Sequence, residues 1–147
     1  MIDRKVLVVF GLALASLMVL SNAHASEIDQ STKLTFSQSV QVPGHVLPAG
    51  TYLFLVDTSP NSNTVRIFSP DRSTLYATLM TIPAQLPNQS DVSGETEITF
   101  ADRGSMQPEA IITWFYPGRT VGHQFQYSQK DRKEIAQANL VTIISGD

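Results

Sequence analysis

Alternation of apolar and polar residues with a period of two dominates the chain after its first thirty residues. In residues 51–57, TYLFLVD, the leucines share one face and the rings share the other. Residues 109–116, EAIITWFY, are also apolar on both faces. A strand that is apolar on both faces lies in the middle of a sheet and is covered on each side. Both segments are therefore predicted as central strands.

Further segments with a strand pattern lie between turns rich in proline and glycine. They are residues 32–36, 40–42, 64–69, 74–82, 95–101, 121–127 and 140–144. Short strands at regular spacing with such turns are typical of an antiparallel sandwich or barrel. The sequence thus predicts an all-β, mainly antiparallel domain, either a β-sandwich or a small barrel, of about seven to nine strands. The period of two is common to both architectures and leaves them open.

Two segments break the alternation. After Tyr127 the period changes, and Ser128 can cap a short C-terminal helix over residues 129–138. In that helix the charged side chains point outward, whereas Ile135 and Ala138 point inward. Residues 83–94 contain two prolines and no periodicity, so this stretch is predicted to be a loop.

The first 25 residues have the pattern of a secretory signal peptide. Arg4 and Lys5 precede the apolar run 6–20, and small residues follow up to Ala25. The run is shorter than the roughly 20 residues that a membrane-spanning helix needs. No cysteine follows it, which excludes a lipid-anchored leader. We expect cleavage after Ala25, a secreted or periplasmic protein, and no membrane span in the mature chain.

Residues 26–147 suit one domain with its own core. The chain has no cysteine, which excludes thiol catalysis and cysteine-ligated metal centres. Its net charge is −3 and it has no unbroken basic cluster. Nucleic-acid binding needs a basic face, so a nucleic-acid partner is not expected. No motif predicts a cofactor.

Several phrases along the chain resemble a group of small exported bacterial β-rich proteins of undetermined function. They are LPAGTY at 47–52, VRIF at 65–68, LYAT at 75–78, WFYPG at 114–118 and GHQFQY at 122–127. They occur in order and extend over nearly all of residues 26–147. The resemblance implies an exported, bacterial, single-domain protein, and it carries no activity that could be transferred to this chain.

Aromatic residues gather on two segments that the Pro117-Gly118 turn joins. Trp114 and Tyr116 lie on the first, and His123 and Tyr127 lie on the second. The favoured interpretation is a core beneath the C-terminal helix, since rings dominate the packing of small domains. The alternative is a ligand-binding surface made of these four residues, on which a sugar or an apolar ligand would stack.

No catalytic or metal-binding constellation stands out. Residues 26–147 hold two histidines, His45 and His123, without a Gly-x-Ser-x-Gly elbow or a metal-ligand spacing. The leading hypothesis is therefore a non-enzymatic exported module that binds a polysaccharide or an envelope protein. One alternative is a small β-barrel with an apolar ligand. The other is a secreted hydrolase that depends on His123.

Overall fold

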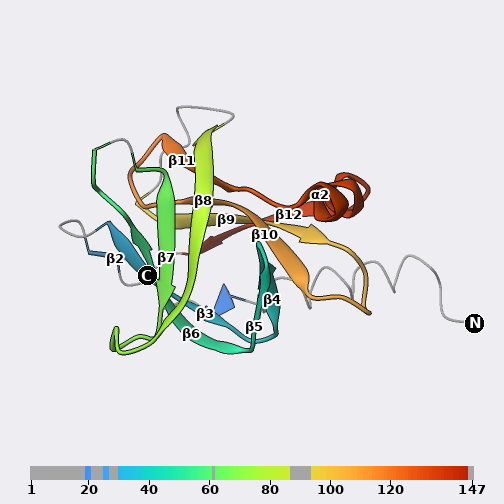
Figure 1. The fold of residues 1–147 in the computed structure, drawn as a ribbon, viewed down its shortest axis with the longest axis horizontal. Helices are drawn as coiled ribbons and strands as arrows, with labels where there is room; N and C mark the ends of the chain where they lie inside the picture. The colour runs from blue at the N-terminus through green and yellow to red at the C-terminus, as the bar shows by residue number, and fades with distance from the viewer. Residues whose placement is uncertain (1–18, 21–24, 27–29, 61, 87–93, 146–147) are drawn as a thin grey trace, which may run out of the picture.

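The computed structural model describes residues 19–20, 25–26, 30–60, 62–86 and 94–145 (Figure 1). The predicted leader lies outside the described residues except at positions 19–20 and 25. Residues 87–93 of the predicted loop lie outside them as well. No helix in the described ranges is long and apolar enough to cross a membrane.

The described residues are mostly strands, and the single described helix lies near the C-terminus. The predicted all-β class with one short C-terminal helix is confirmed. The elements are β1 (Val19–Leu20), β2 (Ala25–Ser26), β3 (Ser31–Phe36), β4 (Val40–Val42), β5 (His45–Leu47), β6 (Gly50–Val56), β7 (Thr64–Phe68), β8 (Leu75–Gln85), β9 (Thr96–Asp102), β10 (Glu109–Phe115), β11 (Val121–Phe125), α2 (Gln129–Ala136) and β12 (Asn139–Ser145).

The long strand β8 joins two halves of a sandwich-like sheet. One part of β8 pairs with β7 in the half that runs β3-β6-β7-β8. From Thr81 to Gln85 the strand pairs instead with β11, which leads on to β10, β9 and β12. Figure 1 shows β8 beside β7 and reaching β11 at its other end. Nearly all pairings are antiparallel, the exception being β10 with β4. Among the described residues the sheet does not close into a barrel.

The core lies between the two halves and combines aliphatic side chains with a set of aromatic rings. Phe36 and Phe54 come from the first half, and Phe100 and Trp114 come from the second. The rings of Phe36 and Phe100 meet edge to face at 6.3 Å between centroids, and those of Phe54 and Trp114 at 5.7 Å. Edge-to-face pairs add to the stabilisation that burial of the rings provides. These contacts fix how the halves face each other.

Two features of the strands differ from the sequence prediction. Strand β8 continues through Pro83, which pairs with His123, although a loop was expected from this proline onward. The pairing of β8 with β7 ends at Met80, so Pro83 removes no hydrogen bond on that side. The second difference is β5, a three-residue strand paired with β4 in a stretch that was expected to form turns only.

Helix α2 forms as its sequence predicts, although it ends two residues earlier. The Ser128 hydroxyl accepts a hydrogen bond from the amide of Asp131 at 3.2 Å, which is the expected N-cap contact. No residue of the helix is fully buried, and Ile135 is half-buried against the core. Figure 1 shows α2 at the end of the molecule that holds β10 and β12, away from β7.

Candidate functional site

The structure places the predicted aromatic residues in the core. Trp114 is fully buried, and Tyr116 and Tyr127 are also buried. Their burial agrees with the core interpretation of the sequence. In this arrangement the three rings present no outer face on which a sugar could stack.

Tyr127 ties strands together rather than facing solvent. Its hydroxyl lies 2.7 Å from the carbonyl oxygen of Ile111 on β10 and 3.0 Å from that of Gln41 on β4, and it donates to these acceptors. Burial raises the pKa of this phenol well above its ordinary value. The hydroxyl therefore keeps its proton and serves as a donor at the junction of β10 and β4.

His123 is half-buried on β11 beside the core. Its ring stacks on Trp114 with 5.7 Å between centroids, and its Nδ1 lies 3.1 Å from the Thr81 hydroxyl. Burial lowers the pKa of the imidazole, which favours the neutral ring. Glu109, an acidic residue that could have oriented this histidine, lies at the other end of β10 from Trp114, which is opposite His123.

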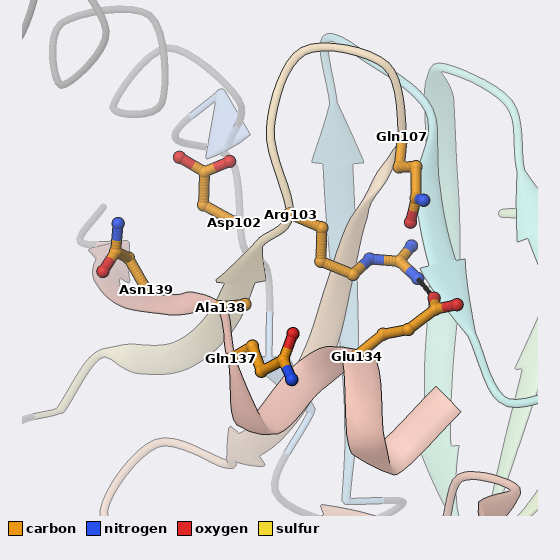
Figure 2. Close-up of a pocket in the computed structure, with 7 residues that line it drawn as sticks. All are labelled: Asp102, Arg103, Gln107, Glu134, Gln137, Ala138 and Asn139. Carbon is orange, nitrogen blue, oxygen red and sulfur yellow. Dashed lines mark ion pairs between the residues drawn. The ribbon is translucent and has the colours of Figure 1, made fainter. Parts of the chain in front are cut away.

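A polar pocket of about 300 Å³ lies beside α2, where the loop between β9 and β10 approaches the helix and the start of β12. Figure 2 shows the guanidinium of Arg103 pointing toward Glu134, with Gln107 beside it and Asp102 and Asn139 at the opposite end. Its lining residues are Asp102, Arg103, Gln107, Glu134, Gln137, Ala138 and Asn139. We call this cavity the polar pocket.

Arg103 is the best-anchored charge of the polar pocket. Its side chain is only 6% exposed, and its Nη1 lies 3.7 Å from a carboxylate oxygen of Glu134 on α2. Its Nη2 donates to the side-chain oxygen of Gln41 and, at 2.7 Å, to the carbonyl of Pro108. Its Nε is buried from solvent and has no hydrogen-bond partner among the described residues. An unpaired buried donor lowers stability, so the three other contacts are what hold the guanidinium in place.

Two carboxylates lie opposite each other at the ends of β9 and β10, and of the two only Asp102 lines the polar pocket. Ala101 pairs with Ala110 in the antiparallel ladder, so the register brings Asp102 opposite Glu109. Glu109 is buried, and its Oε2 lacks a hydrogen-bond partner in the described part of the chain. Burial, with a smaller contribution from the charge of Asp102, raises the pKa of Glu109 to about 7. Near neutral pH this carboxyl group is therefore close to half protonated.

The arrangement supplies donors and acceptors in close proximity. The guanidinium of Arg103 donates, the carboxylates of Asp102 and Glu134 accept, and the amides of Gln107, Gln137 and Asn139 do both. The described residues bring no three His, Asp or Glu side chains close enough together to hold a metal ion. The lining of the polar pocket is thus rich in hydrogen-bond donors and acceptors.

Sequence reasoning missed the polar pocket. Arg103 and Gln107 fall in a predicted turn, and Glu134 falls on the outward face of a predicted helix. The available signal was indirect: Glu109, a charged residue at the first position of a doubly apolar strand, lies opposite the pocket residue Asp102 but does not line the polar pocket.

Searches against family models, curated proteins and solved structures found no match to this chain.

Proposed function

We propose that this protein is an exported, non-enzymatic binding module of the bacterial envelope and that the polar pocket binds a saccharide unit of an envelope polysaccharide. The predicted leader and the resemblance to exported bacterial proteins support export. The observation that carries the binding proposal is the anchored guanidinium of Arg103 in a pocket lined by amide and carboxylate side chains.

The lining of the polar pocket suits neighbouring hydroxyl groups. A sugar hydroxyl both donates and accepts, and amide and carboxylate side chains next to a guanidinium offer both complementary roles. The volume of about 300 Å³ lies at the lower end of the range of small-molecule sites. One saccharide unit therefore fits this proposal better than an extended ligand would.

Charge also favours a neutral polar ligand. The guanidinium of Arg103 is paired with Glu134, and Asp102 also lines the polar pocket, so its lining has no positive excess for a phosphate. The apolar-ligand alternative has weaker support, because Phe36, Phe54 and Trp114 pack against other rings instead of lining a space. The hydrolase alternative would require a partner for His123 beyond Thr81.

The test is a glycan-array and peptidoglycan screen on the exported protein, followed by calorimetry with the best soluble saccharide. Gln137→Ala removes one amide from the polar pocket without touching the core. We expect it to weaken binding by about three- to tenfold, the effect of one lost hydrogen bond. Gln124→Ala, an exposed glutamine on β11, is the matched control and should bind as the unchanged protein does.

Equal affinity of both glutamine variants and the unchanged protein would place any saccharide site elsewhere. Absence of binding to every saccharide tested would contradict the proposed ligand class.

A further inference from the structure

Part of the predicted leader occupies the outer edge of β3. Strand β6 covers one edge of β3, and two short strands pair with the other. In β1, Val19 pairs with Phe36 and Leu20 with Thr35, antiparallel to β3. In β2, Ala25 pairs with Thr32. The expected cleavage after Ala25 would remove all of β1 and one of the two residues of β2.

The short strand β1 also lies close to β12, which joins the sheet through β9 and lies off its main path. Strand β1 contacts β12 as well as β3. Within the described residues β12 pairs only with β9, so its outer edge has no strand partner. Leu140 and Ile144 on β12 are 62% and 56% exposed. A sheet edge with exposed apolar side chains is a ready template for another strand.

We propose that leader removal leaves the β3 edge open as a docking site for one extended, apolar segment of a partner polypeptide, which adds as an antiparallel strand. The inference rests on the export and cleavage proposed above. It concerns a different surface from the polar pocket, which lies between α2 and the β9–β10 loop. The mode of recognition is β-strand addition, in which main-chain hydrogen bonds supply affinity and side-chain positions supply specificity.

The chain's own sequence indicates the chemistry of this partner. The leader residues around β1 read LMVL, uncharged and apolar, at positions 17–20. Of these, Val19 and Leu20 pair with a strand whose inward side chains, Leu34 and Phe36, are each 1% exposed. A charged segment would bring charges to the border of this core, at a high desolvation cost. The partner segment is therefore apolar and β-forming.

The position of β12 favours a single strand over a second copy of the chain. Edge-to-edge pairing of two whole sheets requires open space beside β3. Here β12 lies within contact of the strand that occupies this edge. One extended segment can enter between these strands, whereas a second complete sheet would meet β12.

The experiment uses the exported protein, with its N-terminus determined by sequencing. A fluorescent peptide with the sequence of residues 15–25 is titrated into it and followed by anisotropy. A second peptide carries N-methyl groups on Val19 and Leu20, which block main-chain hydrogen bonds and leave the side chains unchanged. The third arm is the Ala25→Leu precursor, which keeps its leader because the cleavage site has lost its small residue.

We expect the unmodified peptide to bind the cleaved protein and the N-methylated peptide to bind at least tenfold more weakly. The uncleaved precursor should bind neither, since its own strand occupies the edge. Equal binding of both peptides would overturn strand addition, and so would equal binding to precursor and cleaved protein. Absence of peptide binding, or a concentration-dependent dimer of the cleaved protein that competes with the peptide, would overturn the proposed occupant.

Saccharide binding is measured on the same preparation. Loss of peptide binding with intact saccharide binding would refute only the docking edge. The opposite result would refute only the polar pocket. An exported protein that still carries Val19 and Leu20 would overturn the docking edge together with the predicted cleavage.

Discussion

Two connections between neighbouring strands shift the pKa of a carboxyl group in opposite directions. In the β7–β8 turn, residues 69–74, Asp71 is exposed and accepts hydrogen bonds from the Ser69 hydroxyl at 2.6 Å and the Ser73 hydroxyl at 2.7 Å. The Ser73 amide adds a third at 3.1 Å. These contacts lower the pKa of Asp71 to about 2. The charge of Asp71 is therefore stabilised by hydrogen bonds from residues of the same turn.

The β9–β10 loop, residues 103–108, has the opposite character. It begins with the buried guanidinium of Arg103, which contacts Gln41 and Glu134 on elements far away in the sequence. Glu109 follows directly and is buried with one oxygen lacking a partner in the described structure. Its pKa is raised to about 7, the reverse of the shift at Asp71.

The β7–β8 turn only reverses the direction of the chain, whereas the β9–β10 loop also contributes side chains to a candidate binding site. Short polar side chains in a turn can satisfy a carboxylate with neighbours in the sequence. A charge held in the interior lowers stability unless it is fully paired, and such cost is common at binding sites. The contrast therefore supports the candidate site beside the β9–β10 loop, where the polar pocket lies.

Removal of the buried guanidinium of Arg103 should change the free energy of unfolding more than the other substitutions described below. Arg103→Ala would leave Gln41 and the Pro108 carbonyl without their donor and release α2 from the loop. We expect the free energy of unfolding to fall by about 2–3 kcal/mol, measured by urea denaturation. Arg119→Ala, an exposed arginine in another turn, should change it by less than about 0.5 kcal/mol. Equal effects would show that Arg103 has no special structural role.

Neutralising Glu109 should stabilise the protein in a pH-dependent way. The folded state raises the pKa of this group from 4.5 to about 7, so it binds the proton more tightly than the unfolded chain does. Stability is then lost as pH rises from 4.5 through 7. Glu109→Gln should gain about 1–2 kcal/mol at pH 8, after allowance for solvent screening, and nothing at pH 4.

The measurement is urea denaturation of both proteins at the two pH values. A gain that is the same at pH 4 and pH 8 would mean that the group is not the one that titrates.

The serine that supports the β7–β8 turn should have a smaller effect. Ser69 donates to Asp71, and its oxygen accepts from the Thr74 amide at 3.0 Å. Ser69→Ala should lower the free energy of unfolding by about 1 kcal/mol, as measured by thermal melting. Ser105→Ala, an exposed serine of the β9–β10 loop, should be nearly neutral. If Ser105→Ala lowered the free energy of unfolding more than Ser69→Ala, the β7–β8 turn would not be the connection that depends on its own hydrogen bonds.

Asp71 itself should give the smallest effect, with the opposite pH dependence from Glu109. Its folded pKa of about 2 lies below the ordinary 3.8, so its contribution to stability is present above pH 3.8 and is lost as pH falls through 2. Asp71→Asn removes this dependence. Between pH 5 and pH 2 the melting temperature of the unchanged protein should fall further than that of the variant. If the melting temperatures of the two proteins fell in parallel with pH, the hydrogen bonds of the turn would not stabilise the charge of Asp71.

The class of fold follows from patterns of residues that are close together in the chain. Alternation identified nearly every strand of residues 31–145, and Ser128 marked the beginning of α2, because both signals depend on residues close together in the chain. The passage of β8 beyond Pro83 was missed, since a proline is tolerated only where a neighbouring strand leaves that side free.

The candidate site was decided by tertiary structure alone. Arg103 and Gln41 are 62 positions apart, and a period of two does not say which strands become neighbours. The sequence also identified the aromatic residues but did not determine whether they are buried. Their burial depends on the two halves of the sheet facing each other. Side-chain periodicity follows from local backbone geometry, whereas burial and charge pairing follow from contacts between distant segments.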